Sequence, residues 1–193
     1  MVRRRRMVRN YDDRPLPPGV LDRILANATR APSAGFAQGW AFLVLEGRDQ
    51  TEAFWAASLG QRHRHGFRWP GLFRAPAVVV AFSHRQAYLD RYAEPDKAGR
   101  GGAEPGWAVP YWDVDTGFAS LLMLLTAVDA GLGALFFAIP AERTPAVREA
   151  FGVPEAYSPV GAVTIGHPAP DERSGSLARG RRPLEEVVHR GRW

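Results

Sequence analysis

The residues of this chain best suited to chemistry are arginines, and they gather at its two ends. Residues 1–9 contain five arginines and no acidic residue, and residues 173–193 contain six arginines against two glutamates. A guanidinium presents a rigid fork of donors that grips a phosphate through two hydrogen bonds, so two such clusters could hold one anionic ligand. A compositional bias toward Arg, Ala, Gly and Pro would account for the same pattern without any ligand.

Motifs for the commonest catalytic chemistries are missing from the sequence. It contains no GxGxxG or GxxxxGK[ST] loop, no GxSxG elbow and no HExxH pair, and it has no cysteine for a disulfide or a thiolate nucleophile. His63 and His65 could share a metal only from a strand, and the arginines beside them indicate a solvated loop instead. No metal site is expected. If the chain is an enzyme, we expect a bound cofactor to supply the reactive group.

Three segments, taken in order, resemble motifs of the FMN-dependent nitroreductase family. Residues 5–11 (RRMVRNY) are similar to its opening RRSxRxF, residues 31–40 (APSAGFAQGW) to its APSxxNxQPW, and residues 179–183 (RGRRP) to its closing K/R-x-R-x-P. Residues 127–139 (AVDAGLGALFFAI) also carry the GLG turn that the family places after a buried helix. No segment is diagnostic alone, but their order along nearly the whole chain supports the resemblance.

The resemblance implies FMN bound at the interface of a homodimer whose extended terminal arms embrace the partner. The residues implied to surround the FMN phosphate come from both ends of the chain: Arg5, Arg6, Met7, Arg9, Arg179 and Arg181. Those implied to line the ribityl chain and the isoalloxazine ring come from a loop of the second subunit: Pro32, Ser33, Ala34, Phe36 and Gln38. Backbone N–H groups around Phe136, Phe137 and Ala138 are implied to face flavin N5, with Ala138 as the donor.

Three positions depart from the family motifs. Met7 stands where a serine is usual, which removes a hydroxyl from the phosphate site but keeps the backbone N–H. Phe36 replaces the usual asparagine and offers an aromatic face instead of a polar contact, and Gly39 stands where proline is common. The first two departures leave open a flavin-binding or sequestering protein of the same fold with little turnover.

The hydropathy pattern predicts the elements that must position these residues. Apolar or β-branched runs predict strands at 41–47, 77–83, 134–139 and 161–167. Apolar periodicity predicts a helix at 18–30, which Pro32 must end, and a second helix is expected at 50–59. Short strands among helices predict an α/β or α+β layered domain. The resemblance narrows this to an α+β fold with a central, mostly antiparallel sheet flanked by helices.

Two further helices are expected in the second half of the chain. The run from Asp115 to the GLG turn is apolar on nearly every side, which predicts a core helix buried on all faces. Thr144 as N-cap and Pro145 at the first helical position predict a short helix that Gly152 ends.

Residues 84–112 are expected to form a short helix and a long ordered loop, as a lid or insertion within a single domain over residues 1–193. Five aromatic residues of this segment either pack as a hydrophobic cluster under the loop or close over the flavin: Tyr88, Tyr92, Trp107, Tyr111 and Trp112. The tail after residue 167 has too few apolar residues for a core element and is expected to wrap around something.

Composition limits the class of protein. A chain of 193 residues, 46% hydrophobic and 23% charged, suits one globular domain and excludes disorder and collagen. The longest apolar run, 118–128, is too short to cross a bilayer, and the first residues lack the apolar stretch of a signal peptide, so a cytoplasmic location is expected. The net charge is +5, but residues 10–172 hold 14 basic and 18 acidic residues, so the high pI does not require a nucleic-acid-binding face.

The sequence therefore predicts an FMN-dependent oxidoreductase. NADH or NADPH would reduce the flavin, and a small nitroaromatic, quinone or similar conjugated acceptor would then be reduced in the same apolar slot. No side chain is assigned a catalytic role, because the flavin carries the chemistry. A flavin-dependent dehydrogenase or dehalogenase stays open, as does a small nucleic-acid-binding protein with arginine-rich ends.

Overall fold

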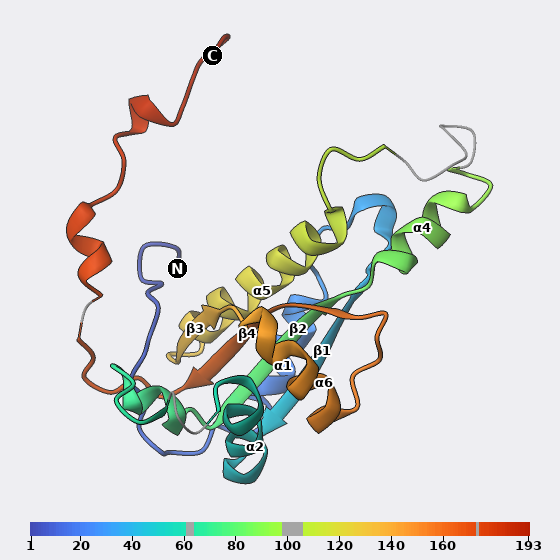
Figure 1. Cartoon of the computed structure of the whole chain (residues 1–193). Coiled ribbons are helices and arrows are strands. Elements are labelled where there is room, and N and C mark those ends of the chain that lie inside the picture. Colours follow the sequence, from blue (N-terminus) through green and yellow to red (C-terminus); the bar gives the residue numbers. More distant parts are fainter. Residues whose placement is uncertain (61–63, 98–105, 173) are drawn as a thin grey trace.

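Four strands form one antiparallel sheet in the order β1-β2-β4-β3 (Figure 1). They are β1 (Trp40–Glu46), β2 (Ala77–Ser83), β3 (Gly133–Phe137) and β4 (Ser158–Gly166). The structure is a computed structural model that describes residues 1–60, 64–97, 106–172 and 174–193. The arrangement confirms the predicted α+β fold, and all four strands lie where the apolar runs predicted them.

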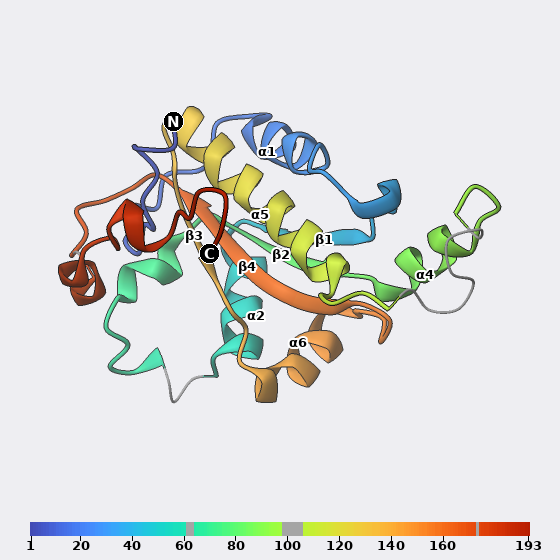
Figure 2. The same ribbon diagram turned by 90° about the horizontal axis from the view of Figure 1, so that it is seen from above.

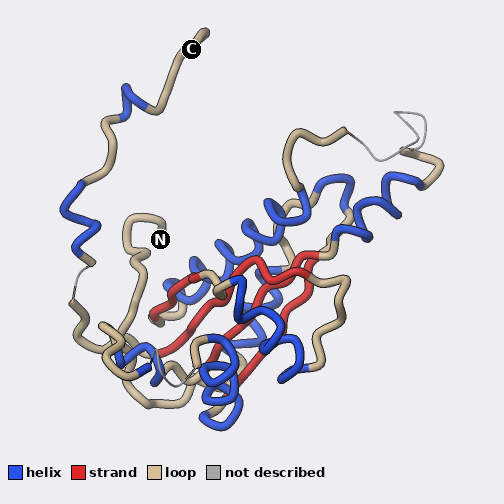
Figure 3. The backbone as a smooth tube through the Cα atoms, viewed as in Figure 1, coloured by secondary structure: helices blue, strands red, loops and turns tan. Residues whose placement is uncertain are grey.

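Helices cover both faces of the sheet (Figures 2 and 3). On one face lie α1 (Val20–Ala28) and α5 (Tyr111–Asp129), and on the other lie α2 (Arg48–Ser58) and α6 (Thr144–Phe151). The short helix α4 (Arg85–Ala93) projects beyond the sheet from the end of β2. The helices predicted at 18–30 and 50–59 are thus confirmed as α1 and α2.

The central strand β2 is buried along its whole length. Its Val79 pairs with Val44 of β1 and Val163 of β4. Successive side chains of a strand point to opposite faces, so Val79 joins the core with α1 and α5, whereas Val78 joins the core with α2. Helices on both faces explain why this strand is continuously apolar.

The prediction that the long helix is buried on all faces is wrong. On α5, Ala119, Met123 and Ala127 are buried against α1 and the sheet, but Phe118 and Leu121 are each 44% exposed. The helix also begins at Tyr111, directly after Pro110 in the N-cap position, rather than at residue 115. One layer of neighbours covers only one side of a helix, so an apolar stripe stays open in the single chain.

The predicted cap of α6 is also wrong in part. Thr144 is the first residue of the helix, Arg143 holds the N-cap position, and no side-chain capping bond forms there. The end is as predicted, because Gly152 adopts a left-handed conformation with φ 62° as the C-cap.

The segment after β2 contains the predicted short helix, α4. Residues 98–105 of the expected lid lie outside the described residues, as does His63. Of the aromatic residues, Trp107 packs edge-on against Tyr88, Tyr92 and Tyr111. These rings thus form a hydrophobic cluster, and the lid over the flavin stays a prediction.

The two ends of the chain behave differently. The N-terminal segment lies along edge strand β3, where Met7 bridges Ala134 and the Val8 N–H donates to the Ala134 carbonyl at 3.1 Å. The C-terminal tail leaves the body after β4 and carries two short 3₁₀ turns, Gly175–Arg179 and Leu184–Glu186 (Figure 1). Every residue from 175 to 193 is exposed, so the tail does not wrap around its own chain.

Within the described ranges, no helix is long and apolar enough to span a membrane.

Candidate active site

A cleft of about 310 Å³ opens beside the end of β3, between that strand, α2 and the turn at residues 70–74. Its lining includes three predicted cofactor contacts from the end of β3 and one arginine of the head: Phe136, Phe137, Ala138 and Arg9. The sequence had grouped these residues only through the family resemblance. The structure brings them to one cavity, and its size lies at the lower end of small-molecule sites.

Aromatic rings form the walls of this cleft. The ring of Trp55, on α2, stacks on Phe137 at 5.5 Å with an interplanar angle of 16°. The guanidinium carbon of Arg9 lies 5.0 Å from the centre of the Trp69 ring, and that of Arg68 lies 4.9 Å from it. Cation–π contacts of this kind hold a guanidinium in place, so Arg9 is fixed at the cleft.

Hydrogen bonds of its backbone and its side chain also hold Arg9 in place. Its N–H donates to Asp171 Oδ2 at 2.8 Å, and its side-chain Nη1 donates to the Met7 carbonyl at 3.3 Å. The second bond is long, and the guanidinium keeps donors that could serve an anion.

Several buried polar atoms near the cleft have no hydrogen-bond partner within the described part of the chain. Three belong to residues that line it: Trp55 Nε1, Ser58 Oγ and Trp69 Nε1. Two more lie outside its lining: Arg5 Nη1 of the arginine head, and Oδ1 of Asp171, the carboxylate that accepts the Arg9 N–H. Leaving such a group unpaired costs about 1–3 kcal/mol, more when it is charged. Most of these atoms are donors, so they fit a ligand rich in acceptor oxygens and nitrogens.

A second group of predicted residues lies in the loop between α1 and β1. The loop turns through the 3₁₀ segment Ala34–Phe36, and Phe36 and Gln38 adopt positive φ angles of 60° and 52°. Residues other than glycine rarely adopt this conformation, and strained backbone of this kind clusters at functional sites. The side chain of Phe36 is 73% exposed.

Contacts from α4 and α5 hold this loop. The Ala34 N–H donates to Asp115 Oδ2 at 2.7 Å, and the Tyr88 hydroxyl donates to the same oxygen at 2.8 Å. Burial raises the pKa of the Tyr88 hydroxyl above its usual range, and the carboxylate of Asp115 adds to the shift, so the group stays protonated as a donor.

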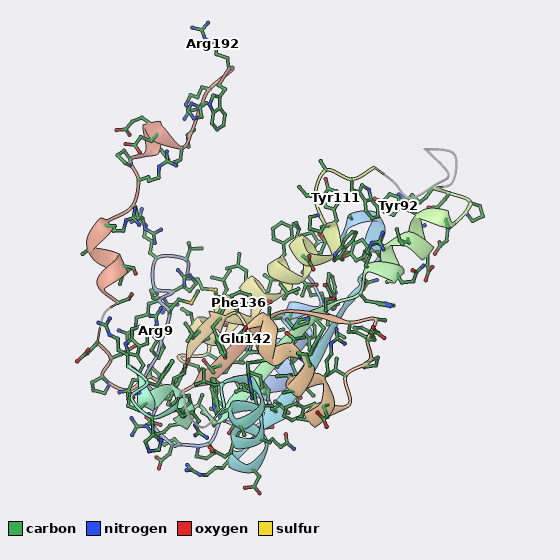
Figure 4. The ribbon with its side chains drawn as sticks, viewed as in Figure 1. Arg9, Tyr92, Tyr111, Phe136, Glu142 and Arg192 are labelled. Carbon is green, nitrogen blue, oxygen red and sulfur yellow. The ribbon has the colours of Figure 1, made fainter. Side chains whose placement is uncertain are left out.

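The loop and the cleft lie apart in the folded chain. Figure 4 shows Arg9 at the left of the molecule, Phe136 near its middle, and Tyr92 and Tyr111, beside the loop, at the right. The tail arginines Arg179 and Arg181 are exposed and, in the part of the chain that the structure describes, make no hydrogen bond or ion pair with the head. A single chain therefore does not bring the full predicted set together.

Individual members of the set differ in burial. Met7 and Arg5 are partly buried, whereas Arg6 and Pro32 are exposed. Ser33 accepts the Gln38 N–H at 2.8 Å. Ala138 follows the last paired residue of β3, so its N–H lies outside the ladder. No group of three potential metal ligands exists among the residues with described positions.

Sequence reasoning missed the residues that build the walls. Trp55 lies on a helix that gave no functional signal, and Trp69 closes a basic segment interpreted as a solvated loop. The interleaving of arginine and aromatic residues in RHGFRW, residues 64–69, was the one available signal. Tyr88 was singled out only as one of five aromatic residues of segment 84–112, and Asp115 gave no functional signal, because the bonds of both to the loop depend on the tertiary fold.

Known proteins match this chain over most of its length. The model of the nitroreductase family matches residues 2–167. A Methanothermobacter thermautotrophicus protein, provisionally named an NADH dehydrogenase/NAD(P)H nitroreductase, is 28% identical over 170 residues, which is 87% of this chain and 75% of the relative. An NADPH-dependent oxidoreductase of Staphylococcus aureus is 25% identical over 195 residues, spanning all of this chain and 72% of the relative.

The fold has solved counterparts. A provisionally named nitroreductase from Desulfovibrio desulfuricans, solved in complex with FMN, is similar with a TM-score of 0.70 and 24% identity, covering 97% of this chain and 92% of that one. A structural likeness at this level of identity establishes the architecture.

Proposed function

The chain belongs to the nitroreductase family, and from that premise we propose that it is an FMN-dependent oxidoreductase. It takes electrons from NADH or NADPH and delivers them to a small nitroaromatic, quinone or similar conjugated acceptor. The observation that carries this proposal is that one cleft holds Arg9, the end of β3 with Ala138, and unpartnered buried donors.

The residues of the cleft fit FMN in charge and shape. Arg9 supplies a fixed cation for the phosphate, where each charge-assisted hydrogen bond contributes about 1.5–3 kcal/mol. Arg5, whose buried Nη1 has no partner, would bind the same phosphate. Arg6 and the backbone N–H of Met7 would supply its remaining contacts from the arginine head. The stacked Trp55 and Phe137 provide a flat apolar wall for the isoalloxazine ring.

When bound, FMN supplies hydride transfer at N5, first from the nicotinamide and then to the acceptor. The protein contributes position and environment. The Ala138 N–H, which lies outside the sheet ladder, would donate to N5 of bound FMN, and the arginines would offset the negative charge that reduction adds. The aromatic walls would limit the access of water to the bound ring.

The active form is proposed to be a homodimer. The exposed apolar stripe of α5, with Phe118 and Leu121, and the apolar residues of the tail, such as Leu177 and Leu184, are surfaces that a second copy would cover. In that assembly the loop residues Pro32 to Gln38 of one copy would line the flavin of the other, and Arg179 and Arg181 of the tail would reach the phosphate.

An absorption spectrum of the purified protein tests the cofactor, repeated after denaturation to identify what is released. We expect a yellow protein that releases FMN, is bleached by NADH or NADPH and is recoloured by a nitroaromatic or a quinone. A colourless protein that does not bind added FMN would refute the proposal. Tight duplex binding with a steep salt dependence in such a protein would favour a nucleic-acid partner instead.

A second candidate function is flavin binding or sequestration with little turnover. Two departures from the family motifs favour it: Met7 removes a hydroxyl from the phosphate site, and Phe36 replaces a polar residue of the loop. A protein that releases FMN on denaturation but is not bleached by either nicotinamide would support this candidate.

A further inference from the structure

We propose that Asp115 and Tyr88 are positioning residues that lock the loop 33–38 into its left-handed conformation and so present Phe36 to a planar ring bound by the second subunit. Neither residue belongs to the cofactor contacts described above. The target of Phe36 rests on the proposed function, whereas the lock itself is a property of the chain alone.

The loop needs such a lock because its conformation is unfavourable. Gly35, Phe36 and Gln38 all have positive φ angles, of 62°, 60° and 52°. Only glycine adopts such angles without steric cost, so Phe36 and Gln38 would relax to other conformations if the surroundings did not fix them. The side chain that this strain presents, Phe36, is largely exposed in the single chain.

The contacts that fix the loop meet at one oxygen. Asp115 Oδ2 accepts both the Ala34 N–H at 2.7 Å and the Tyr88 hydroxyl at 2.8 Å, and Asp115 is only 3% exposed. Hydrogen bonds to a charged carboxylate oxygen are shorter and stronger than hydrogen bonds to a neutral acceptor. The turn at Ala34 is therefore tied to α5 directly.

A second contact extends the lock to the end of the loop. Ser33 Oγ accepts the Gln38 N–H at 2.8 Å and lies 3.4 Å from the Tyr88 hydroxyl. Tyr88 thus bridges Asp115 and Ser33, and Ser33 closes the turn over Gln38. From the same helix, Arg91 Nε donates to the Gly35 carbonyl at 2.8 Å.

The close approach of Tyr88 also explains an unusual residue of the loop. A Cβ atom on Gly39 would lie 2.5 Å from the Tyr88 ring and 2.8 Å from the His84 carbonyl oxygen. Proline, common at this position in the family motif, could not fit there. Gly39 and Tyr88 therefore form one packing arrangement, which brings the hydroxyl of Tyr88 to the loop.

The test compares two conservative variants with a matched control. Tyr88→Phe removes one hydroxyl and keeps the ring that packs on Gly39, and Asp115→Asn keeps the shape but removes the charge. Tyr92→Phe is the control, because Tyr92 lies on the same helix and no hydrogen bond of its hydroxyl is found among the described residues. Hydrogen exchange of the loop amides in the flavin-free protein is the first measurement, and FMN affinity by flavin fluorescence is the second.

We expect exchange at Ala34 and Gln38 to rise at least about tenfold in both variants, with exchange in β2 unchanged. FMN affinity should fall by a similar factor in both variants, and Tyr92→Phe should match the wild type in loop exchange. The double variant should lose little more than the worse single one, since both changes act on one oxygen.

Unchanged loop exchange in both variants would overturn the lock, and so would a uniform rise over the whole sheet, which indicates general destabilisation. Faster loop exchange with unchanged FMN affinity would overturn the role of the lock in the site. If the wild type itself binds no FMN, the proposed function fails, while the exchange measurement still decides whether the lock exists.

Discussion

Two indole N–H groups distinguish the ends of the cleft at the scale of single residues. Trp69 lies against Arg9, whose guanidinium is the proposed phosphate ligand, whereas Trp55 stacks on Phe137 at the proposed ring end. Both Nε1 atoms are buried and unpartnered within the described chain. A buried N–H group gains a hydrogen bond when a ligand supplies an acceptor, and this increases the affinity for that part of the ligand. Trp69 Nε1 should therefore favour the phosphate end of FMN, and Trp55 Nε1 its ring.

This placement predicts different ligand selectivity for two similar variants. Trp69→Phe should weaken FMN binding about tenfold and leave riboflavin binding unchanged, because the lost N–H lies at the phosphate end. Trp55→Phe should weaken both flavins equally. Fluorescence titration with FMN and riboflavin measures the difference, with Trp193→Phe in the exposed tail as control. An equal loss for both flavins in Trp69→Phe would contradict the assignment of the two ends.

Arg5 allows a prediction about the arginine head. Its Nη1 is buried without a partner, whereas the neighbouring Arg4 is exposed. Arg5→Ala should therefore weaken FMN binding by about tenfold or more, since it removes a charge-assisted bond to the phosphate, and Arg4→Ala should change it little. Equilibrium dialysis against FMN checks both. If Arg4→Ala caused the larger loss, the buried guanidinium would not be the phosphate ligand.

At the scale of elements, the hydropathy pattern predicted the strands and helices whose positions depend on neighbouring residues in the sequence. The run AVVVAFS gave β2 with its observed bounds, because a strand covered on both faces must be continuously apolar. The start of α5 was missed because Tyr111 and Trp112 follow a proline in a segment interpreted as a loop. The exposed side of α5 was missed because the hydropathy pattern shows which residues of a helix are apolar, but does not show how many other elements pack against the helix.

The candidate site was predictable only in part for the same reason. The resemblance selected Arg9 and the end of β3, which the fold brings to one cleft. Trp55 and Trp69 reach that cleft through packing between distant segments, so no local pattern marked them. The bond from Asp115 to Ala34 likewise joins residues far apart in sequence.

Gly39 connects the loop to β1, and its close contacts give a prediction at this scale. Gly39→Ala should destabilise the chain by about 1–3 kcal/mol, because the added Cβ meets the backbone oxygen of His84 at 2.8 Å and the Tyr88 ring, and the backbone oxygen cannot easily move. Thermal or urea unfolding measures the effect. Gly175→Ala, where nothing lies within 4 Å, is the matched control and should be close to neutral. A neutral Gly39→Ala would show that Tyr88 does not approach the loop as described.

At the scale of the whole molecule, the candidate site residues are divided between two separate places in the fold. The cleft and the strained loop lie apart in one chain, and α5, with its open apolar stripe, runs from the loop toward β3 (Figures 1 and 4). A two-fold axis places the same patch of both copies against each other, so each copy can offer its loop to the cleft of the other. The proposed dimer thus has two composite sites.

Composite sites predict complementation between two inactive variants. Arg9→Glu should abolish FMN binding at the cleft of its own copy, and Phe36→Asp should disable the loop that this copy offers to its partner. Neither variant alone should bind FMN well. When the two are unfolded, mixed in equal amounts and refolded, about half of the dimers should be mixed, and each mixed dimer has one intact cleft facing one intact loop.

The mixture should therefore recover about a quarter of the wild-type FMN sites, because one site in two is intact in about half of the dimers. Counting bound FMN by absorbance after gel filtration measures this recovery, and each variant refolded alone is the control. If loop and cleft of the same copy formed the site, every site in the mixture would still carry one of the two defects. Recovery would then be no greater than the average of the two controls, and the assignment of the loop to the partner would be wrong.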